Sequence, residues 1–335
     1  MIRLRAPAKL NLYLAILGKR PDGFHELETV FERVDLADEL TFEPQPSGLT
    51  LTCTDPALSC GQDNLIMKAA NALQRASSVS QGARIRLRKR IPVAAGLGGG
   101  SSDAACTLLG LNELWKLRWE RSQLAKLAAQ LGSDVPFFLL ETPFAIGRGR
   151  GERLEPLADA KPLTQVLVVP DAQLSTKDVY AGFDRRHLTA GPSSISMVAH
   201  ALRNGPALAG LADGLRNDLE PEAIQRCPVI ARIREQLKVA GCLASRLSGS
   251  GPAVFGLCRD QRNAQAIVST LRQRAPSSWR IEIIQTDRPS SLQSRGGTGW
   301  RSPRSGSRSV RSSPVPLQAA QGRKPAIPGR LEKSG

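Results

Sequence analysis

The sequence contains no uninterrupted apolar stretch near the roughly 18 residues that a membrane-spanning helix requires. An apolar run near the N-terminus, residues 10–17, is interrupted by Asn11 and followed by a Gly-Lys-Arg segment. A signal peptide would end in a small-residue cleavage site, so we interpret this run as a β-strand. We therefore expect neither a membrane span nor an export signal.

The cysteines and histidines do not form the spacing motifs of metal-binding or redox sites. Six cysteines are present, but no two have the two-residue spacing of a zinc-binding or redox motif. A chain of 335 residues can bury a core without disulfides. With no export signal, we expect reduced thiols and a cytoplasmic protein. The three histidines are scattered and do not indicate a metal-binding cage.

Acidic residues are outnumbered, 30 against 46 lysines and arginines, which gives a net charge of +16. Residues 288–335 hold ten basic residues and one acidic residue, so this segment alone carries +9. The segment is rich in Ser, Arg, Gly and Pro, and it cannot bury enough surface to offset the entropy of ordering. We predict a disordered basic tail over these residues. Nucleic-acid binding is the alternative, but Trp300 is the one aromatic residue of the tail that could stack on a base.

The body of the chain alternates strand-like and helix-like segments. Asp63 is a candidate cap for a helix with an apolar stripe from residue 65 to 76, and Gly132 is expected to end a later helix in the left-handed conformation. A fresh strand after Gly- and Pro-containing loops predicts a domain boundary near residue 160, with domains at 1–160 and 161–287. The other expected elements are strands at 2–6, 10–17, 84–89, 165–169, 253–257 and 280–284, and helices at 101–116 and 122–131.

The strongest signal is a glycine-rich segment, PVAAGLGGGSSDAA, at residues 92–105. Glycines let the backbone approach a phosphate closely, and the helix that follows adds unsatisfied N–H groups and the positive end of its dipole. No Gly-Lys-Ser/Thr follows, which excludes the Walker motif, and the acidic residue of a dinucleotide-binding motif is missing. We predict a loop that binds the phosphates of ATP in a small-molecule kinase. A linker or tight turn is the weaker alternative.

Two charged residues are candidates for the transfer chemistry. Phosphoryl transfer to an alcohol requires a carboxylate near the hydroxyl and cations that hold the moving charge. Asp134 lies in a Gly-Ser-Asp turn before Val-Pro-Phe-Phe, where partial burial would favour a general base. Lys9 lies within an apolar, strand-like stretch. Taken alone, a turn cap explains Asp134 and an edge-strand lysine explains Lys9 equally well.

Three sequence blocks together carry a family resemblance. They are PAKLNLYLAILGKRPDGFHELETVF from residue 7, IPVAAGLGGGSSDAA from residue 91 and SRLSGSGPAVFG from residue 245, with LGSDVPFF and RNDLEP between the last two. The chain resembles the GHMP kinases over about residues 1–287. The resemblance implies a two-domain fold of α+β and α/β character. An N-terminal, ribosomal-protein-like domain would bind ATP, a C-terminal domain would be ferredoxin-like, and the substrate would lie in the cleft between them.

The resemblance also assigns roles. It implies that Asp134 takes the proton of the substrate hydroxyl, while Lys9 stabilises the alkoxide and keeps Asp134 ionised. It implies ATP and Mg²⁺ as cofactors, with Ser102 near the metal and Lys89 in the lining of the nucleotide pocket. The implied ATP-binding residues are Asn64, Pro92, Val93, Ala94, Ala95, Gly96, Leu97, Gly98, Gly99, Gly100, Ser101 and Ser102.

The extra glycines after Gly-Leu-Gly and the PDGFHEL block imply one branch of the family, whose substrate is a methylerythritol that carries a cytidine diphosphate group. The hydroxyl at C2 would be phosphorylated in a route to isoprenoid precursors. His25 would meet the edge of the cytosine, and Phe24 and Tyr180 would cover its two faces, with Phe183 as the substitute for Tyr180. The implied substrate-binding residues are Asn11, Phe24, His25, Tyr180, Gly249, Ser250 and Gly251.

Two other functions remain open from the sequence. One is a GHMP kinase of the homoserine or mevalonate type, against which the glycine spacing and the PDGFHEL block argue. The other is a nucleic-acid-binding protein that acts through its basic tail. The oligomeric state is not predicted.

Overall fold

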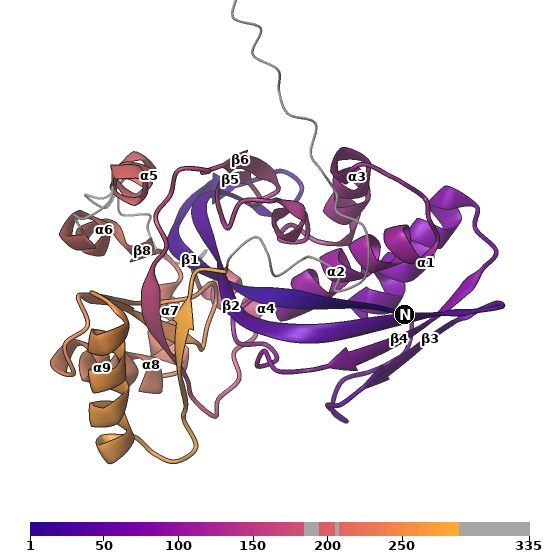
Figure 1. Cartoon of the computed structure of the whole chain (residues 1–335). Coiled ribbons are helices and arrows are strands. Elements are labelled where there is room, and N and C mark those ends of the chain that lie inside the picture. Colours follow the sequence, from indigo (N-terminus) through magenta and orange to yellow (C-terminus); the bar gives the residue numbers. More distant parts are fainter. Residues whose placement is uncertain (184–193, 205–207, 288–335) are drawn as a thin grey trace, which may run out of the picture. The chain divides into compact units, whose positions relative to one another are not determined.

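The computed structural model describes residues 1–183, 194–204 and 208–287. Within these ranges the chain forms two β-sheets with helices packed on them (Figure 1). The predicted tail at 288–335 lies outside the described residues. No helix in the described ranges is long and apolar enough to cross a membrane, and all six cysteines are free.

A long antiparallel hairpin forms the centre of the first sheet. Its strands are β1 (Ile2–Lys19) and β2 (His25–Gln45), paired from Ile2 opposite Phe42 to Lys19 opposite His25. The two strands that the sequence predicts at 2–6 and 10–17 are therefore one strand, with a register shift between Pro7 and Ala8. The main strand order is β3-β4-β2-β1-β8. The further strands are β3 (Leu49–Cys53), β4 (Gly82–Arg88), β5 (Phe144–Gly149), β6 (Arg153–Pro156) and β8 (Arg216–Asn217).

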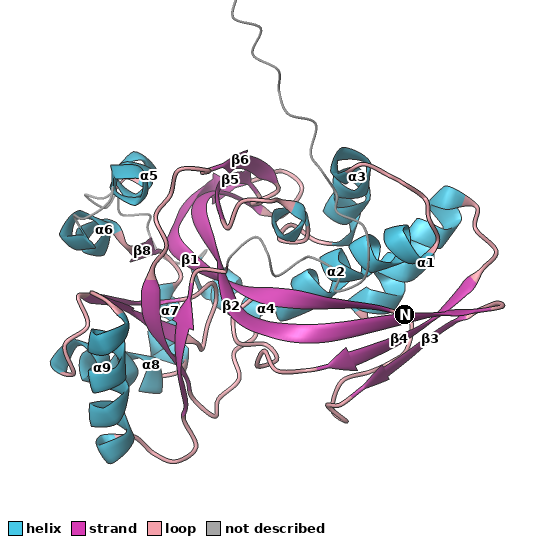
Figure 2. Ribbon diagram, viewed as in Figure 1, coloured by secondary structure: helices cyan, strands magenta, loops and turns pink. Residues whose placement is uncertain are grey.

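Two helices, α1 (Leu65–Ser77) and α2 (Gly99–Leu114), pack on the first sheet, and α3 (Arg121–Leu131) packs on these helices (Figure 2). Their apolar side chains share one core with Phe42 and Ile85 of the sheet. Asn64, and not Asp63, caps α1, because its side chain accepts the N–H of Ile66. The left-handed conformation predicted for Gly132 is wrong, since its φ of 170° is ordinary extended backbone.

The second sheet has the strand order β11-β7-β10-β9, with every neighbouring pair antiparallel. Because α8 follows β7 and α9 follows β10, this is the ferredoxin-like arrangement that the sequence resemblance implies. One face packs on α8 and α9, and the other meets β1 and β2. The elements are β7 (Thr164–Val169), α8 (Val229–Val239), β9 (Ala244–Leu247), β10 (Val254–Cys258), α9 (Gln261–Arg274) and β11 (Arg280–Gln285).

The segments between these parts carry site residues and cross between the sheets. The predicted domain boundary at residue 160 falls between β6 and β7. However, β8 comes from the later part of the chain and pairs with β1 of the first sheet. The domain boundary therefore stays a prediction. These segments are the short 3-10 helix η1 (Pro136–Leu139), α4 (Thr176–Phe183), α5 (Ile195–Asn204), α6 (Leu208–Gly214) and α7 (Glu220–Arg226).

Buried polar groups join the two sheets. The guanidinium of Arg33 in β2 pairs with the carboxylate of Asp287 at 2.9 Å, and both side chains are fully buried. The neighbouring Glu32 accepts hydrogen bonds from Thr286 and Gln165, each at 2.6 Å. Burial raises the pKa of Glu32 to about 7, although these two hydrogen bonds oppose the shift. We call this contact between the two sheets, formed by Arg33, Asp287, Glu32, Thr286 and Gln165, the joint. Its stability depends on the charge of Glu32.

Candidate active site

The glycine-rich loop connects β4 to α2, and its backbone conformation explains its composition. Gly96 has a φ of 79° and Gly98, which caps α2, has a φ of 68°. A methyl group at Gly98 would lie 2.8 Å from Cγ of Lys9. A methyl group at Gly96 would overlap the carbonyl oxygen of Ser248. Glycine is therefore required at both positions by backbone angle and by space.

The late glycine loop, which follows β9, packs directly against the first loop. The hydroxyl of Ser248 donates to the carbonyl of Gly96 at 3.1 Å, and the N–H of Ala253 donates to the carbonyl of Ala95 at 3.2 Å. Gly249 lies beside Lys9, since a Cβ there would be 3.2 Å from Nζ. Segments about 150 residues apart in sequence thus form one wall of a site.

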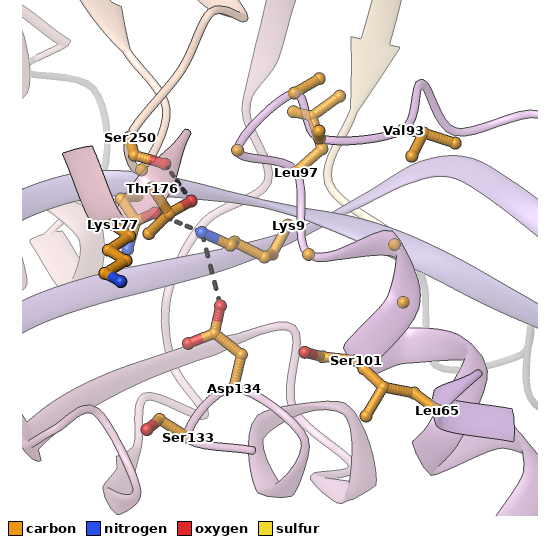
Figure 3. Close-up of a pocket in the computed structure, with 18 of the residues that line it drawn as sticks. Lys9, Leu65, Val93, Leu97, Ser101, Ser133, Asp134, Thr176, Lys177 and Ser250 are labelled. Carbon is orange, nitrogen blue, oxygen red and sulfur yellow. Dashed lines mark hydrogen bonds and ion pairs between the residues drawn. The ribbon is translucent and has the colours of Figure 1, made fainter. Parts of the chain in front are cut away.

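Lys9 and Asp134 form an ion pair in this site (Figure 3), with Nζ and Oδ2 3.6 Å apart. Lys9 is almost completely buried, whereas the side chain of Asp134 is 31% exposed. Nζ of Lys9 also donates to Oδ1 of Asn11 at 2.5 Å, and Nδ2 of Asn11 donates to Thr29 at 2.8 Å. Burial lowers the pKa of Lys9, and the charge of Asp134 opposes that shift. A hydroxyl placed beside Asp134 would therefore meet both a proton acceptor and a fixed cation.

A second buried ion cluster lies under the start of α2. Nζ of Lys89 contacts Asp38 at 2.5 Å and Asp103 at 2.8 Å. The other oxygen of Asp38 accepts the N–H groups of Arg90 and Ile91, the two residues before the loop begins. Burial raises the pKa of Asp103 to about 7, against the lowering effect of Lys89. The cluster joins the entry of the glycine loop to the helix at its exit, which fixes the loop.

One cavity of about 1010 Å³ contains both loops and the ion pair. Almost all the site residues expected from the sequence line it, and the exceptions are Ser102, Gly251 and the substitute aromatic Phe183. The Ser102 side chain is buried, and its hydroxyl has no hydrogen-bond partner among the described residues. Its neighbour Ser101 lines the cavity instead. The roles of all these residues remain predictions.

Aromatic side chains form another part of the cavity lining. The rings of His25 and Tyr180 have centroids 5.0 Å apart and are tilted by 37°, and Phe183 meets His25 edge-on at 6.4 Å. Phe24 is 51% exposed, and the guanidinium of Arg150 lies 4.8 Å from its ring centroid. Tyr180 therefore lies against His25, while Arg150 covers one face of Phe24.

Sequence reasoning missed several residues of the cavity. Arg150, Thr176 and Lys177 line it, and the hydroxyl of Thr176 hydrogen-bonds to that of Ser250 at 2.8 Å. Arg150 lies between two glycines in GRGRGE, and that pattern is a weak signal of a shaped loop. Thr176 and Lys177 carry no local signal, since their place depends on packing between α4 and the late loop.

A glycine loop at a helix N-terminus, beside a lysine–aspartate pair in a deep cavity, is an arrangement suited to phosphoryl transfer. Comparison with known families gives the same class. The family descriptions "GHMP kinases N terminal domain" and "GHMP kinases C terminal" match residues 64–142 and 198–277. The chain belongs to the GHMP kinases, which are ATP-dependent phosphotransferases with this two-domain fold.

Within the family, the chain is similar over most of its length to one kind of kinase. It is 44% identical over 274 residues to the 4-diphosphocytidyl-2-C-methyl-D-erythritol kinase of Pelotomaculum thermopropionicum, a match that covers 82% of this chain and 94% of that protein. The kinase of the same name from Gloeobacter violaceus is 43% identical, over 81% of this chain and 90% of that protein.

Solved structures agree with these sequence relatives. A crystal structure of 4-(cytidine 5'-diphospho)-2C-methyl-D-erythritol kinase superposes with a TM-score of 0.71 at 36% identity, covering 84% of this chain and 98% of that one. Homoserine kinase from Cytophaga hutchinsonii superposes with a TM-score of 0.66 at 19% identity, covering 86% and 94%. The latter likeness reflects the shared fold alone.

Proposed function

We propose that this chain transfers the γ-phosphate of ATP to the C2 hydroxyl of 4-diphosphocytidyl-2-C-methyl-D-erythritol. The observation that carries the proposal is identity of 43–44% over more than four-fifths of the chain to kinases that bear this name. The cavity supports it, because its aromatic lining suits a flat base and its glycine-rich loops suit phosphates.

In this proposal the two loops hold the reacting phosphates. N–H groups from residues 96–101 would bind the phosphates of ATP, and the Asp38–Lys89–Asp103 cluster would keep them in position. Asn64 would contribute at the nucleotide end, where it caps α1 and lines the cavity. Because these contacts fix the loop, little reorganisation is needed at the moment of transfer.

Asp134 would accept the proton of the substrate hydroxyl as its oxygen attacks the γ-phosphorus. Lys9 would stabilise the negative charge that develops on that oxygen, since its ammonium is buried beside Asp134 and held by Asn11. The bond from the γ-phosphorus to the bridging oxygen of ADP breaks, and the proton leaves on Asp134. A positioned base of this kind contributes about 10²- to 10⁴-fold to the rate.

Magnesium would enter with ATP. The residues fit such an ion, because the buried hydroxyl of Ser102 lacks a hydrogen-bond partner among the described residues and Mg²⁺ prefers oxygen ligands. No cluster of three or more His, Cys, Asp or Glu side chains suited to a metal occurs in the described ranges. The metal would neutralise charge on the phosphates, and Ser102 is the chain's own candidate to hold it.

The decisive experiment follows the product directly. The enzyme is incubated with ATP, Mg²⁺ and the diphosphocytidyl methylerythritol, and the 2-phosphate is sought by mass spectrometry with ADP release in parallel. Homoserine and mevalonate are offered under the same conditions. We expect turnover of the cytidine compound alone. Comparable ADP release with homoserine or mevalonate would move the chain to another branch of the family.

A further inference from the structure

The basic side chains that line the cavity differ in whether a nearby carboxylate balances their positive charge. Lys9, Lys89 and Arg150 each lie within 4.0 Å of a carboxylate. Lys177 is exposed and has no carboxylate within ion-pair distance in the described part of the chain. In full, the lining cations among the described residues are Lys9, Lys19, Lys89, Arg150 and Lys177. The uncompensated charge of Lys177 is therefore available to an anionic ligand.

Lys177 lies on the turn of α4 between Tyr180 and the contact with the late loop. It occupies the first turn of α4, three residues before Tyr180. Its neighbour Thr176 hydrogen-bonds to Ser250 of the late loop, and the adjoining Gly249 lies against Lys9. Figure 3 shows Lys177 beside Thr176 and near Ser250, with all three residues on one side of the Lys9 ammonium. This turn therefore connects Tyr180 to the loop that lies beside Lys9.

From this arrangement we infer that Lys177 binds the diphosphate of the substrate, between the cytosine end and the reacting hydroxyl. The inference rests on the proposed function, in which a diphosphate joins the cytidine to the methylerythritol. An ammonium group binds a diphosphate as a compact point charge with three donors. In the first turn of α4 the N–H of Asp178 already donates to Ser175, so the N–H groups of Thr176 and Lys177 remain as further donors.

A solvent-exposed lysine with no role is the alternative, and it predicts no ligand dependence. A phosphate contact predicts a penalty that grows with the number of phosphates on the ligand. Cytidine, CMP and CDP form such a series, because they share the base and ribose and differ in charge. They separate recognition of the diphosphate from recognition of the cytosine.

The test compares wild type, Lys177→Ala, Lys177→Arg and Lys238→Ala. Lys238 lies on the exposed side of α8, outside the cavity, and controls for the loss of a surface charge. Each nucleotide is measured as a competitive inhibitor against the alcohol substrate, at saturating ATP. For Lys177→Ala we expect CDP to bind about tenfold more weakly, the effect of one hydrogen bond to a charged group, with cytidine unchanged.

The other variants and outcomes complete the test. Lys177→Arg should retain most of the CDP affinity, and Lys238→Ala all of it. Equal loss of cytidine and CDP affinity in Lys177→Ala, or no loss of either, would overturn the inference while leaving the proposed kinase activity intact. If wild type binds none of the three nucleotides, the cytidine diphosphate substrate is itself wrong, and the role of Lys177 falls with it.

Discussion

The contact between the two glycine loops gives the sharpest prediction, which concerns Gly96. Its φ of 79° is one that alanine adopts at a cost of about 1–2 kcal/mol. An added methyl group would overlap the backbone oxygen of Ser248 and lie 2.9 Å from the backbone nitrogen of Gly251. Both neighbours are backbone atoms, so the late loop must move as a unit to make room.

The magnitude follows from these two contributions. Overpacking in a close contact costs about 1–3 kcal/mol, so Gly96→Ala should lower the free energy of unfolding by about 2–5 kcal/mol. For a folded body of this size the melting temperature should fall by roughly 3–8 °C. Because the displaced loop also lies against Lys9, kcat should fall about 100-fold, the typical effect of a displacement near 1 Å.

Gly210 provides the matched control. It lies in α6 with open space where a Cβ would be, and its φ is not in the left-handed region. Gly210→Ala should leave kcat unchanged and stabilise the helix by about 0.5–1 kcal/mol. Circular dichroism melting and ADP release, corrected for the folded fraction, measure both effects. A Gly96→Ala enzyme with wild-type melting temperature and turnover would refute the requirement for glycine at this contact.

Three further predictions concern the base, the joint and the tail. Asp134→Ala should lower kcat about 10²- to 10⁴-fold with little change in the KM for ATP, and near-normal turnover would remove this residue from the mechanism. Glu32 binds its proton more tightly in the folded state than in the unfolded state, where its pKa is near 4.5, so the free energy of unfolding should fall by about 3 kcal/mol as pH rises from about 4.5 to 7. Urea unfolding at pH 5 and pH 8 checks this, and Glu32→Gln should lose most of the slope; an identical slope in the variant would contradict the assignment. A chain that ends at residue 290 should keep kinase activity. A chain that ends at residue 284 lacks Thr286 and Asp287, so Arg33 is buried without its carboxylate. Its free energy of unfolding should be lower by about 3–5 kcal/mol. Equal melting temperatures for the two truncated chains would count against this role of the joint.

The parts of the site that are continuous in sequence could be predicted from it. The glycine loop, the helix after it and the turn at Asp134 each carry their own local signal of composition and spacing. Lys9 was predicted from a charge in an apolar stretch together with the family resemblance. Its neighbours in space, Asn11 and Asp134, agree with that prediction, although its role is untested.

The long strand β2 was not predicted, because charged residues interrupt its apolar residues and hide the pattern of a buried strand. Glu32, Arg33 and Asp38 are fully buried, and each is compensated by a residue from elsewhere in the chain. Those partners are 51 to 254 residues away in sequence. No periodicity can identify a buried charge whose partner is so distant, since local pattern reports only the average preference for solvent.

Separation along the sequence also explains why Lys177 and Thr176 could not be predicted. Their place in the site depends on how the two sheets are held together at the joint. Lys9 and Asp134 come from the first sheet and its connections, whereas Thr176 and Ser250 belong to the second. The relative position of these two sets depends on the contacts that join the sheets. Separating the sheets would expose Arg33 and Asp287, which are paired at 2.9 Å, and would remove the hydrogen bonds of Glu32. Because breaking a buried pair leaves uncompensated charge, the joint resists small shifts and holds both walls of the cavity at fixed spacing. Polar groups remote from the reacting atoms thus add to the direct contact between the two glycine loops in holding the α4 turn near the Lys9–Asp134 pair.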